Sequence, residues 1–166
     1  MSENLNNLLN EKIEEYKSKT TTSQKLQADA AKYMPGGSTR TTQWMDPYPF
    51  YAKYAKEQNI TDVDGNSYLD FMINATSLIH GHASPNVINA IKSQSDIGTA
   101  YSAPTDGQTK LSKMITERTP SMETLRFTNS GTEATMMAIM AARAFTNKQK
   151  IAKFENISVF QGTYLE

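Results

Sequence analysis

The sequence predicts a mixed α/β fold, and two stretches of its 166 residues carry this prediction. Residues 50–72 alternate apolar and polar positions on both sides of Asp64-Gly65, a turn signal typical of a β-hairpin. Residues 124–154 consist of a short apolar run, a long helix-forming stretch and a second apolar run. A strand, a helix and a strand at this spacing predict a parallel α/β unit with a right-handed crossover.

The N-terminal part of the chain predicts helices. Residues 3–33 carry Leu and Ile at three- and four-residue spacing with Glu and Lys between them, which is the pattern of an amphipathic helix. The run Thr20-Thr21-Thr22-Ser23 should break this stretch into two helices, and Thr22 or Ser23 is the expected cap of the second. Pro35-Gly36-Gly37 should end it.

The next segments should form a loop and the hairpin. Pro47 and Pro49 exclude a central strand, so residues 38–50 are expected to be loop. The hairpin should have strands at 50–60 and 67–72, joined by a tight turn at 62–66.

The second half of the chain predicts alternating helices and strands. Proline is tolerated in the first turn of a helix, so Pro85 should begin one. The expected elements are a helix over 85–95, a helix from Thr105 or Asp106 to Arg118, a strand over 124–127, a helix over 132–146 and a strand near 151–154.

Composition excludes several classes of protein. Basic and acidic residues balance at 17 each, which gives no support for a nucleic-acid or membrane partner. The chain has no cysteine and hence no disulfide framework, thiolate nucleophile or zinc–thiolate site. No apolar run reaches the roughly 18 residues of a membrane helix, and Met1 to Asn10 lacks the pattern of a secretory signal. A cytoplasmic protein is expected.

The segment Asn129-Ser130-Gly131-Thr132-Glu133-Ala134 is the leading candidate for a binding site. It stands between a predicted strand and a predicted helix, where backbone N–H groups without partners and the helix dipole favour an anion. Gly131 allows close approach of a ligand, and the Ser130 and Thr132 hydroxyls can add hydrogen bonds. The alternative is a plain N-cap with an acidic first turn.

Four motifs in a fixed order carry a resemblance to a known family. They are Met34-Pro35-Gly36-Gly37, Asp62-Val63-Asp64-Gly65-Asn66, Gly81-His82-Ala83-Ser84-Pro85 and Asn129-Ser130-Gly131-Thr132-Glu133-Ala134. Their order and spacing resemble the N-terminal part of the class III pyridoxal-phosphate-dependent aminotransferases, and most of all the glutamate-1-semialdehyde aminomutase-like group. The similarity covers about residues 25 to 155.

The resemblance implies the N-terminal part of a type I pyridoxal-phosphate transferase fold, with the small-domain hairpin and the start of the large, mainly parallel sheet. It implies an N-terminal helical segment over 1–35, a small-domain segment over 36–100 and an incomplete cofactor-binding domain over 101–166. The implied cofactor is pyridoxal 5'-phosphate, the implied substrates are small amino compounds and keto acids or aldehydes, and a homodimer is implied for the full-length protein.

The resemblance also assigns candidate site residues. Ser130, Gly131 and Thr132 would bind the cofactor phosphate, Phe160 would stack on the cofactor ring, and Arg40 would bind a substrate carboxylate. Gln161 replaces the family's usual histidine, and the spacer before Phe160 is two residues longer than usual. Phe160 as an apolar anchor and Arg40 as a solvated surface residue are the alternatives.

No catalytic residue and no metal site are predicted. His80 and His82 flank Gly81 without a nearby carboxylate in sequence, and Asp62 and Asp64 lack the glutamate that would complete a calcium loop. In the family, the lysine that binds the cofactor covalently and the acidic partner of its ring lie beyond the equivalent of residue 166. We therefore expect a fragment that is inactive and folds poorly alone. The rival hypothesis is a short non-catalytic module that binds phosphate or another protein.

Overall fold

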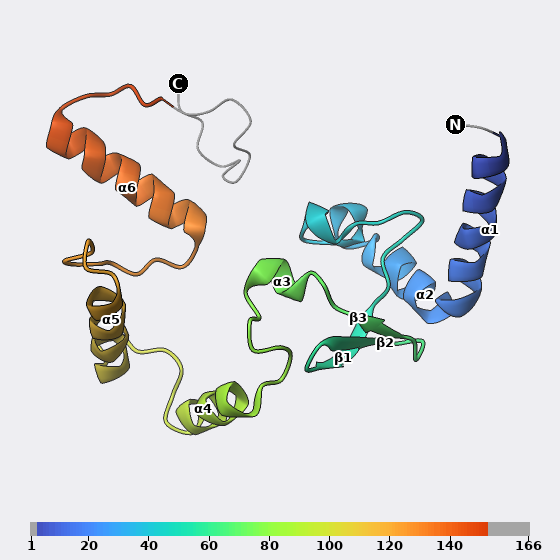
Figure 1. The fold of residues 1–166 in the computed structure, drawn as a ribbon, viewed down its shortest axis with the longest axis horizontal. Coiled ribbons are helices and arrows are strands. Elements are labelled where there is room, and N and C mark those ends of the chain that lie inside the picture. Colours follow the sequence, from blue (N-terminus) through green and yellow to red (C-terminus); the bar gives the residue numbers. More distant parts are fainter. Residues whose placement is uncertain (1–2, 153–166) are drawn as a thin grey trace. The chain divides into compact units, whose positions relative to one another are not determined.

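The computed structural model describes residues 3–152, which form helices and a small sheet (Figure 1). The chain divides into two units between Thr99 and Ala100, which are described separately below. The first contains α1 (Glu3–Lys19), α2 (Thr21–Ala30), the 3-10 turns η1 (Pro35–Gly37) and η2 (Thr41–Gln43), β1 (Ala52–Lys56), β2 (Asn59–Asp62), β3 (Ser67–Leu69), α3 (Ile73–Thr76) and α4 (Pro85–Ser95). The second contains α5 (Asp106–Arg118) and α6 (Gly131–Thr146). The assignment of 36–100 and 101–166 to a small and a large domain stays a prediction.

The break predicted inside residues 3–33 is confirmed at Thr20, where α1 ends and α2 begins (Figure 1). The buried Thr20 hydroxyl donates to the carbonyl of Tyr16 at 2.7 Å and lies 3.1 Å from the hydroxyl of Tyr48. The hydroxyl of Tyr16 donates to the carbonyl of Tyr48 at 2.9 Å, and the two rings lie 5.4 Å apart. Tyr48, from the loop before β1, therefore fixes the bend between the two helices.

The N-terminus of α2 is capped by a distant residue. The carboxylate of Asp64 accepts hydrogen bonds from the backbone N–H of Thr22 at 2.6 Å, the backbone N–H of Ser23 at 3.0 Å and the Ser23 hydroxyl at 2.7 Å. Partial burial raises the pKa of Asp64, but the hydrogen bonds from Ser23 and Thr22 outweigh it and lower the pKa to about 2. The expected cap by Thr22 or Ser23 is therefore wrong, because both lie inside the helix.

The sheet has three antiparallel strands in the order β1-β2-β3. Ile60 of β2 pairs with Ala55 of β1 on one side and with Tyr68 of β3 on the other. The single strand predicted over 50–60 is wrong, because the chain reverses at Glu57, which has a φ of 53°. A two-residue hairpin loop needs positive φ values that Gly or Asn usually supplies, so a reversal without them leaves little sequence signal.

The predicted turn between β2 and β3 is confirmed, and a buried carboxylate organises it. Asp62 is fully buried, and both of its carboxylate oxygens accept hydrogen bonds. Oδ1 accepts from the backbone N–H groups of Asp64 at 2.9 Å and Asn66 at 2.8 Å, while Oδ2 accepts from Asn66 Nδ2 and the Tyr68 hydroxyl, each at 2.8 Å. Burial raises the pKa of Asp62, but the bonds from Asn66, Tyr68 and Asp64 outweigh it and hold the pKa below its usual value.

In the second unit, the helices match the sequence prediction and the strands do not. α5 covers the predicted span, and α6 begins one residue before the predicted 132. Residues 124–127 form no strand in the described part of the chain, and neither do residues 151–152, while 153–154 lie outside it. A parallel strand exists only through hydrogen bonds to neighbouring strands, and an apolar run cannot supply these by itself.

Burial within residues 3–152 is sparse and mostly polar. Tyr48 is the buried hydrophobic residue there, beside Thr20, Ser23, Gln27 and Asp62. Large apolar side chains lie exposed on several helices, among them Leu5, Leu8 and Leu9 on α1 and Met136, Met140 and Phe145 on α6. Poor folding of the isolated chain stays a prediction. Within the described span, no helix combines the length and the apolar character needed to cross a membrane.

Candidate cofactor-binding site

The start of α6 holds the three residues expected to bind a phosphate. Ser130 is the N-cap, with extended backbone angles (φ −152°, ψ 160°), and its hydroxyl oxygen accepts from the backbone N–H of Glu133 at 3.2 Å. Because that oxygen is the acceptor, the hydroxyl hydrogen stays available to a ligand. Ser130 can therefore cap the helix and donate to an anion at the same time.

The residues before the helix are fixed by two further hydrogen bonds. A Glu133 carboxylate oxygen accepts from the backbone N–H of Asn129 at 2.7 Å, and the Thr128 hydroxyl donates to the carbonyl of Ser130 at 3.0 Å. A serine cap followed three residues later by a glutamate that reaches back is a variant of the capping box. The loop thus enters α6 in a defined conformation.

The first-turn donors of α6 point to anion binding. Gly131 and Thr132 are exposed, and within residues 3–152 their backbone N–H groups and the Thr132 hydroxyl have no protein acceptor. The helix has 16 residues, so its dipole adds a partial positive charge at these donors. Three donors on two adjacent residues, together with the Ser130 hydroxyl, match the oxygens of a phosphate.

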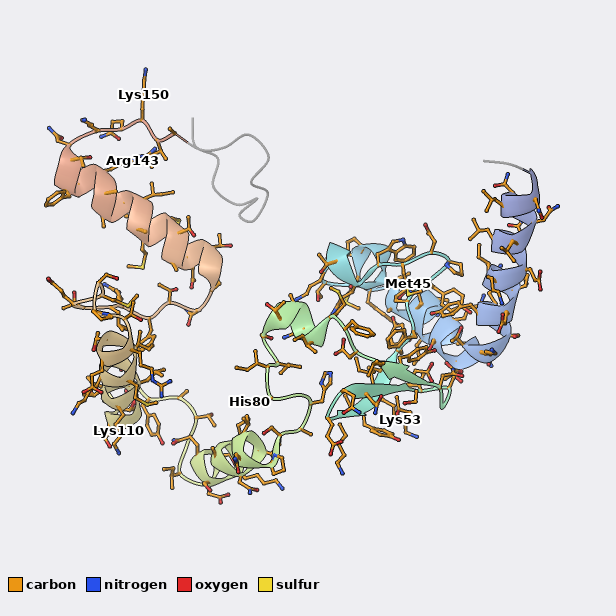
Figure 2. The ribbon with its side chains drawn as sticks, viewed as in Figure 1. Met45, Lys53, His80, Lys110, Arg143 and Lys150 are labelled. Atoms are coloured by element: carbon orange, nitrogen blue, oxygen red, sulfur yellow. The ribbon has the colours of Figure 1, made fainter. Side chains whose placement is uncertain are left out.

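The cationic side chains that Figure 2 labels on and after α6 lie toward the C-terminus of this helix, away from Ser130. Figure 2 shows Arg143 near the C-terminus of α6 and Lys150 in the segment that follows. The Nε of Arg143 donates to the carbonyl of Gln149 at 2.8 Å, and a cation there complements the negative end of the helix dipole. Arg143 is therefore placed to stabilise the C-terminal end of α6, at the opposite end of the helix from Ser130.

Arg40 lies in the first unit, in the loop between η1 and η2. Its side chain is exposed, while its backbone N–H donates to the Ser38 hydroxyl at 3.2 Å and its carbonyl accepts from Gln43 N at 3.1 Å. The same loop borders a cavity of about 500 Å³, to which Ser38, Thr39 and Gln43 contribute but Arg40 does not. The guanidinium has no side-chain partner in the described residues, so it is free to bind a carboxylate.

The predicted site residues fall in different parts of the chain. Ser130, Gly131 and Thr132 are adjacent at one helix start, Arg40 belongs to the other unit, and Phe160 lies outside the described residues. No group of three metal-ligating side chains is found within 3–152, and Asp62 and Asp64 serve the β2–β3 turn and α2 instead.

One half-buried pair was not predicted from the sequence. Asp70 Oδ2 lies 2.6 Å from Nε2 of His82, one of the two histidines weighed above as metal ligands. The hydrogen bond from His82 holds the pKa of Asp70 below its usual value. The two residues are 12 positions apart in a loop, and no local periodicity signals such a contact.

Comparison with known proteins agrees with the resemblance seen in the sequence. The sequence pattern of the family described as Aminotransferase class-III matches residues 41–165. A glutamate-1-semialdehyde 2,1-aminomutase from Methanobrevibacter smithii is 45% identical over 133 residues, which are 80% of this chain and 31% of that protein.

Solved structures of transaminases share the fold. An omega-transaminase from Sphaerobacter thermophilus is 48% identical with a TM-score of 0.77, over 80% of this chain and 30% of its own. A transaminase with bound PLP is 44% identical with a TM-score of 0.79, over 81% of this chain and 32% of its own. These similarities confirm the predicted fold class.

The chain spans about a third of the length of the curated relatives that it matches. The family pattern nevertheless covers most of its residues, including the whole of the small sheet and the start of α6. The chain therefore belongs to the class-III aminotransferase family.

Proposed function

We propose that this chain is the N-terminal part of a pyridoxal-phosphate-dependent aminotransferase or aminomutase, and that it holds the cofactor phosphate. The observation that carries the proposal is the start of α6, where the exposed N–H groups of Gly131 and Thr132 have no protein acceptor within residues 3–152. Relatives named as aminomutase and as PLP-bound transaminase support the identity of the ligand.

The residues at this helix start fit a phosphate. Backbone N–H groups and hydroxyls donate hydrogen bonds, and the helix dipole favours the negative charge. Gly131 has no side chain that would separate the ligand from the backbone. Ser130 would add its hydroxyl hydrogen while it keeps its role as the N-cap.

The chemistry of the reaction comes from the cofactor, whose pyridine ring can delocalise the electron pair left when a substrate loses its α-proton. The role of this chain is to hold the phosphate end in one orientation, so that the rest of the cofactor is fixed relative to the substrate. None of its described residues is assigned to proton transfer, and the full-length protein would supply that group. We also propose that the full-length protein is a cytoplasmic homodimer that moves an amino group between small molecules.

Replacement of the two site hydroxyls should separate phosphate binding from helix capping. Thr132→Val removes a hydroxyl without a protein partner in the described residues, so PLP affinity of the full-length protein should fall about tenfold with little change in stability. Ser130→Ala should lower the affinity and also cost about 1 kcal/mol of stability through the lost cap.

Fluorescence titration with PLP would measure the affinity, and unfolding in urea would measure the stability. Thr135→Val is the matched control, because the Thr135 hydroxyl donates to the carbonyl of Gly131 within the helix and should not contact the phosphate. Unchanged affinity in both Thr132→Val and Ser130→Ala would contradict the proposed phosphate site and leave the non-catalytic interaction module as the better explanation.

Arg40 is proposed to bind a carboxylate of the substrate, because its exposed guanidinium has no side-chain partner in the described residues. Arg40→Gln should then raise KM at least about tenfold for a carboxylate-bearing substrate and leave KM for a simple amine unchanged. Steady-state kinetics with the two substrates, and with Arg118→Gln as an exposed control, would measure this. An equal change for both substrates would mean that Arg40 acts on the structure alone.

A further inference from the structure

A loop in the first unit is closed at its base by partly buried polar contacts. Asp70 follows β3, and its Oδ2 lies 2.6 Å from Nε2 of His82; the two side chains are 7% and 16% exposed, respectively. The backbone of His82 exchanges two hydrogen bonds with Glu57, the residue directly after β1, at 2.9 and 2.7 Å. These contacts fasten both ends of the loop 71–81 to the sheet.

Asp70 also fixes the first residues inside the loop. Its Oδ1 accepts from the backbone N–H groups of Met72 and Ile73, each at 2.9 Å. At the other end, Gly81 has a φ of 74°, and a side-chain carbon there would come within 2.8 Å of the Glu57 carbonyl oxygen. The base of the loop thus has little freedom to shift.

Between these fixed ends, the backbone is strained. Ile73, Asn74, Ala75 and Thr76 have φ values of 39°, 50°, 53° and 68°, which form a left-handed turn without a single glycine. Residues other than glycine disfavour this region, and it is most unfavourable for β-branched side chains such as those of Ile73 and Thr76. Such a conformation persists only where the surrounding structure imposes it.

The side chains of the loop do not supply that constraint by packing. Phe71, Met72 and Ile79 are 87%, 67% and 78% exposed, and Ile73 and Leu78 are only half-buried. Within the turn, Thr76 N donates to the Met72 carbonyl at 3.1 Å and Leu78 N to the Ile73 carbonyl at 3.1 Å. Asn74 Nδ2 also donates to the Ser77 hydroxyl at 3.0 Å, and that hydroxyl donates to the Asn74 carbonyl at 2.9 Å. All of these bonds are local, and a right-handed turn could form equivalent ones, so they do not select the left-handed conformation. The bond from the Ile73 N–H to Asp70 joins the turn to the base of the loop.

We infer that Asp70 and His82 form a latch that imposes the left-handed conformation on residues 73–76. The loop is then a conformational device with two states: a strained state while the latch is closed, and a relaxed state with ordinary backbone angles when it is open. None of the residues involved is one of those proposed to bind the phosphate.

Glycine substitutions in the full-length protein test the strain. Ile73→Gly and Thr76→Gly should raise the urea midpoint for opening of residues 52–82, followed by hydrogen exchange, because glycine adopts positive φ without strain. Met72→Gly is the matched control: Met72 is an exposed neighbour with a φ of −82°, so glycine there should lower the midpoint. A fall of the midpoint in all three variants would overturn the proposal.

A double-mutant cycle tests the latch itself. Asp70→Ala should speed hydrogen exchange at the Met72 and Ile73 amides, and in this background Ile73→Gly should no longer raise the midpoint, because the turn has already relaxed. His82→Ala gives a second, milder background if Asp70→Ala fails to fold. A glycine gain of the same size with and without the latch would show that Asp70 and His82 do not impose the conformation.

Discussion

Replacement of Gly131 with aspartate should raise the dissociation constant of PLP in the full-length protein at least about 100-fold. Gly131 is the first residue of α6, and its backbone N–H has no protein acceptor in the described residues. A carboxylate there would occupy the space proposed for the phosphate and repel its charge. Like charges forced together cost several kcal/mol, and 100-fold corresponds to about 2.7 kcal/mol.

The same substitution should not weaken the helix. An acidic residue in the first turn interacts favourably with the helix dipole, so the stability of α6 should be unchanged or slightly higher. Circular dichroism and urea unfolding of the variant would test this beside the PLP titration. Lost affinity in a protein of undiminished stability can then be assigned to the phosphate and not to unfolding.

Gly107→Asp is the matched control. Gly107 also lies in the first turn of a helix, α5, whose N-cap Thr105 accepts from the N–H of Gln108. A side-chain carbon at Gly107 would meet no atom within 4 Å, so aspartate should fit there and leave PLP affinity unaltered. Equal losses in both variants would mean a general effect of added charge, and no loss at Gly131 would mean that the phosphate binds elsewhere.

Helices were the predictable part of the fold, because their signals are local. The sequence signals for three helix boundaries each span only a few residues. They are the break at Thr20, the proline that starts α4 and the cap that starts α5. The strands were harder, because their formation depends on partners. The reversal at Glu57 has no Gly or Asn signal, and the run at 124–127 has no strand beside it in the described part of the chain.

The same distinction holds for functional residues. Ser130, Gly131 and Thr132 form one contiguous motif, so the sequence could place all three at a single helix start. Other contacts join segments that are distant in sequence and meet only when the chain folds. Asp64 caps α2 from 41 to 42 positions away, and Asp70 contacts His82 from 12 positions away. Family resemblance could mark the motifs containing Asp64 and His82, but it did not say what either side chain contacts.

Asp62→Asn should be the most destabilising of the conservative substitutions in the first unit, with a loss of about 3 kcal/mol. The buried carboxylate accepts four hydrogen bonds, from two backbone N–H groups, Asn66 Nδ2 and the Tyr68 hydroxyl. An amide has one acceptor oxygen and turns its NH2 group toward donors, so at least one buried donor loses its partner at about 1–3 kcal/mol and two donors face each other. Such a loss is a large share of a typical stability of about 5–15 kcal/mol.

Hydrogen exchange across residues 52–69 in urea would measure the loss in the full-length protein. Asp29→Asn is the matched control, because Asp29 is 62% exposed and makes a single ion pair with Lys32, so its replacement should cost less than about 1 kcal/mol. Tyr68→Phe removes one of the four donors, so its loss of stability should lie between those of Asp62→Asn and Asp29→Asn. A loss at Asp62 no larger than at Asp29 would mean that the buried carboxylate does not organise the turn.

The destabilisation should also depend on pH. The pKa of Asp62 is lower in the folded protein than in the free side chain, so the unfolded chain takes up a proton first as the pH falls. The stabilisation by Asp62 is therefore complete above about pH 4 and is lost as the pH falls below the usual aspartate range. Because an asparagine side chain cannot titrate, the difference between wild type and Asp62→Asn should stay nearly constant from about pH 6 to about pH 4 and narrow as the pH falls from about 4 toward about 2. A difference that stays constant over the lower interval would show that the shape of the side chain, and not its charge, holds the turn.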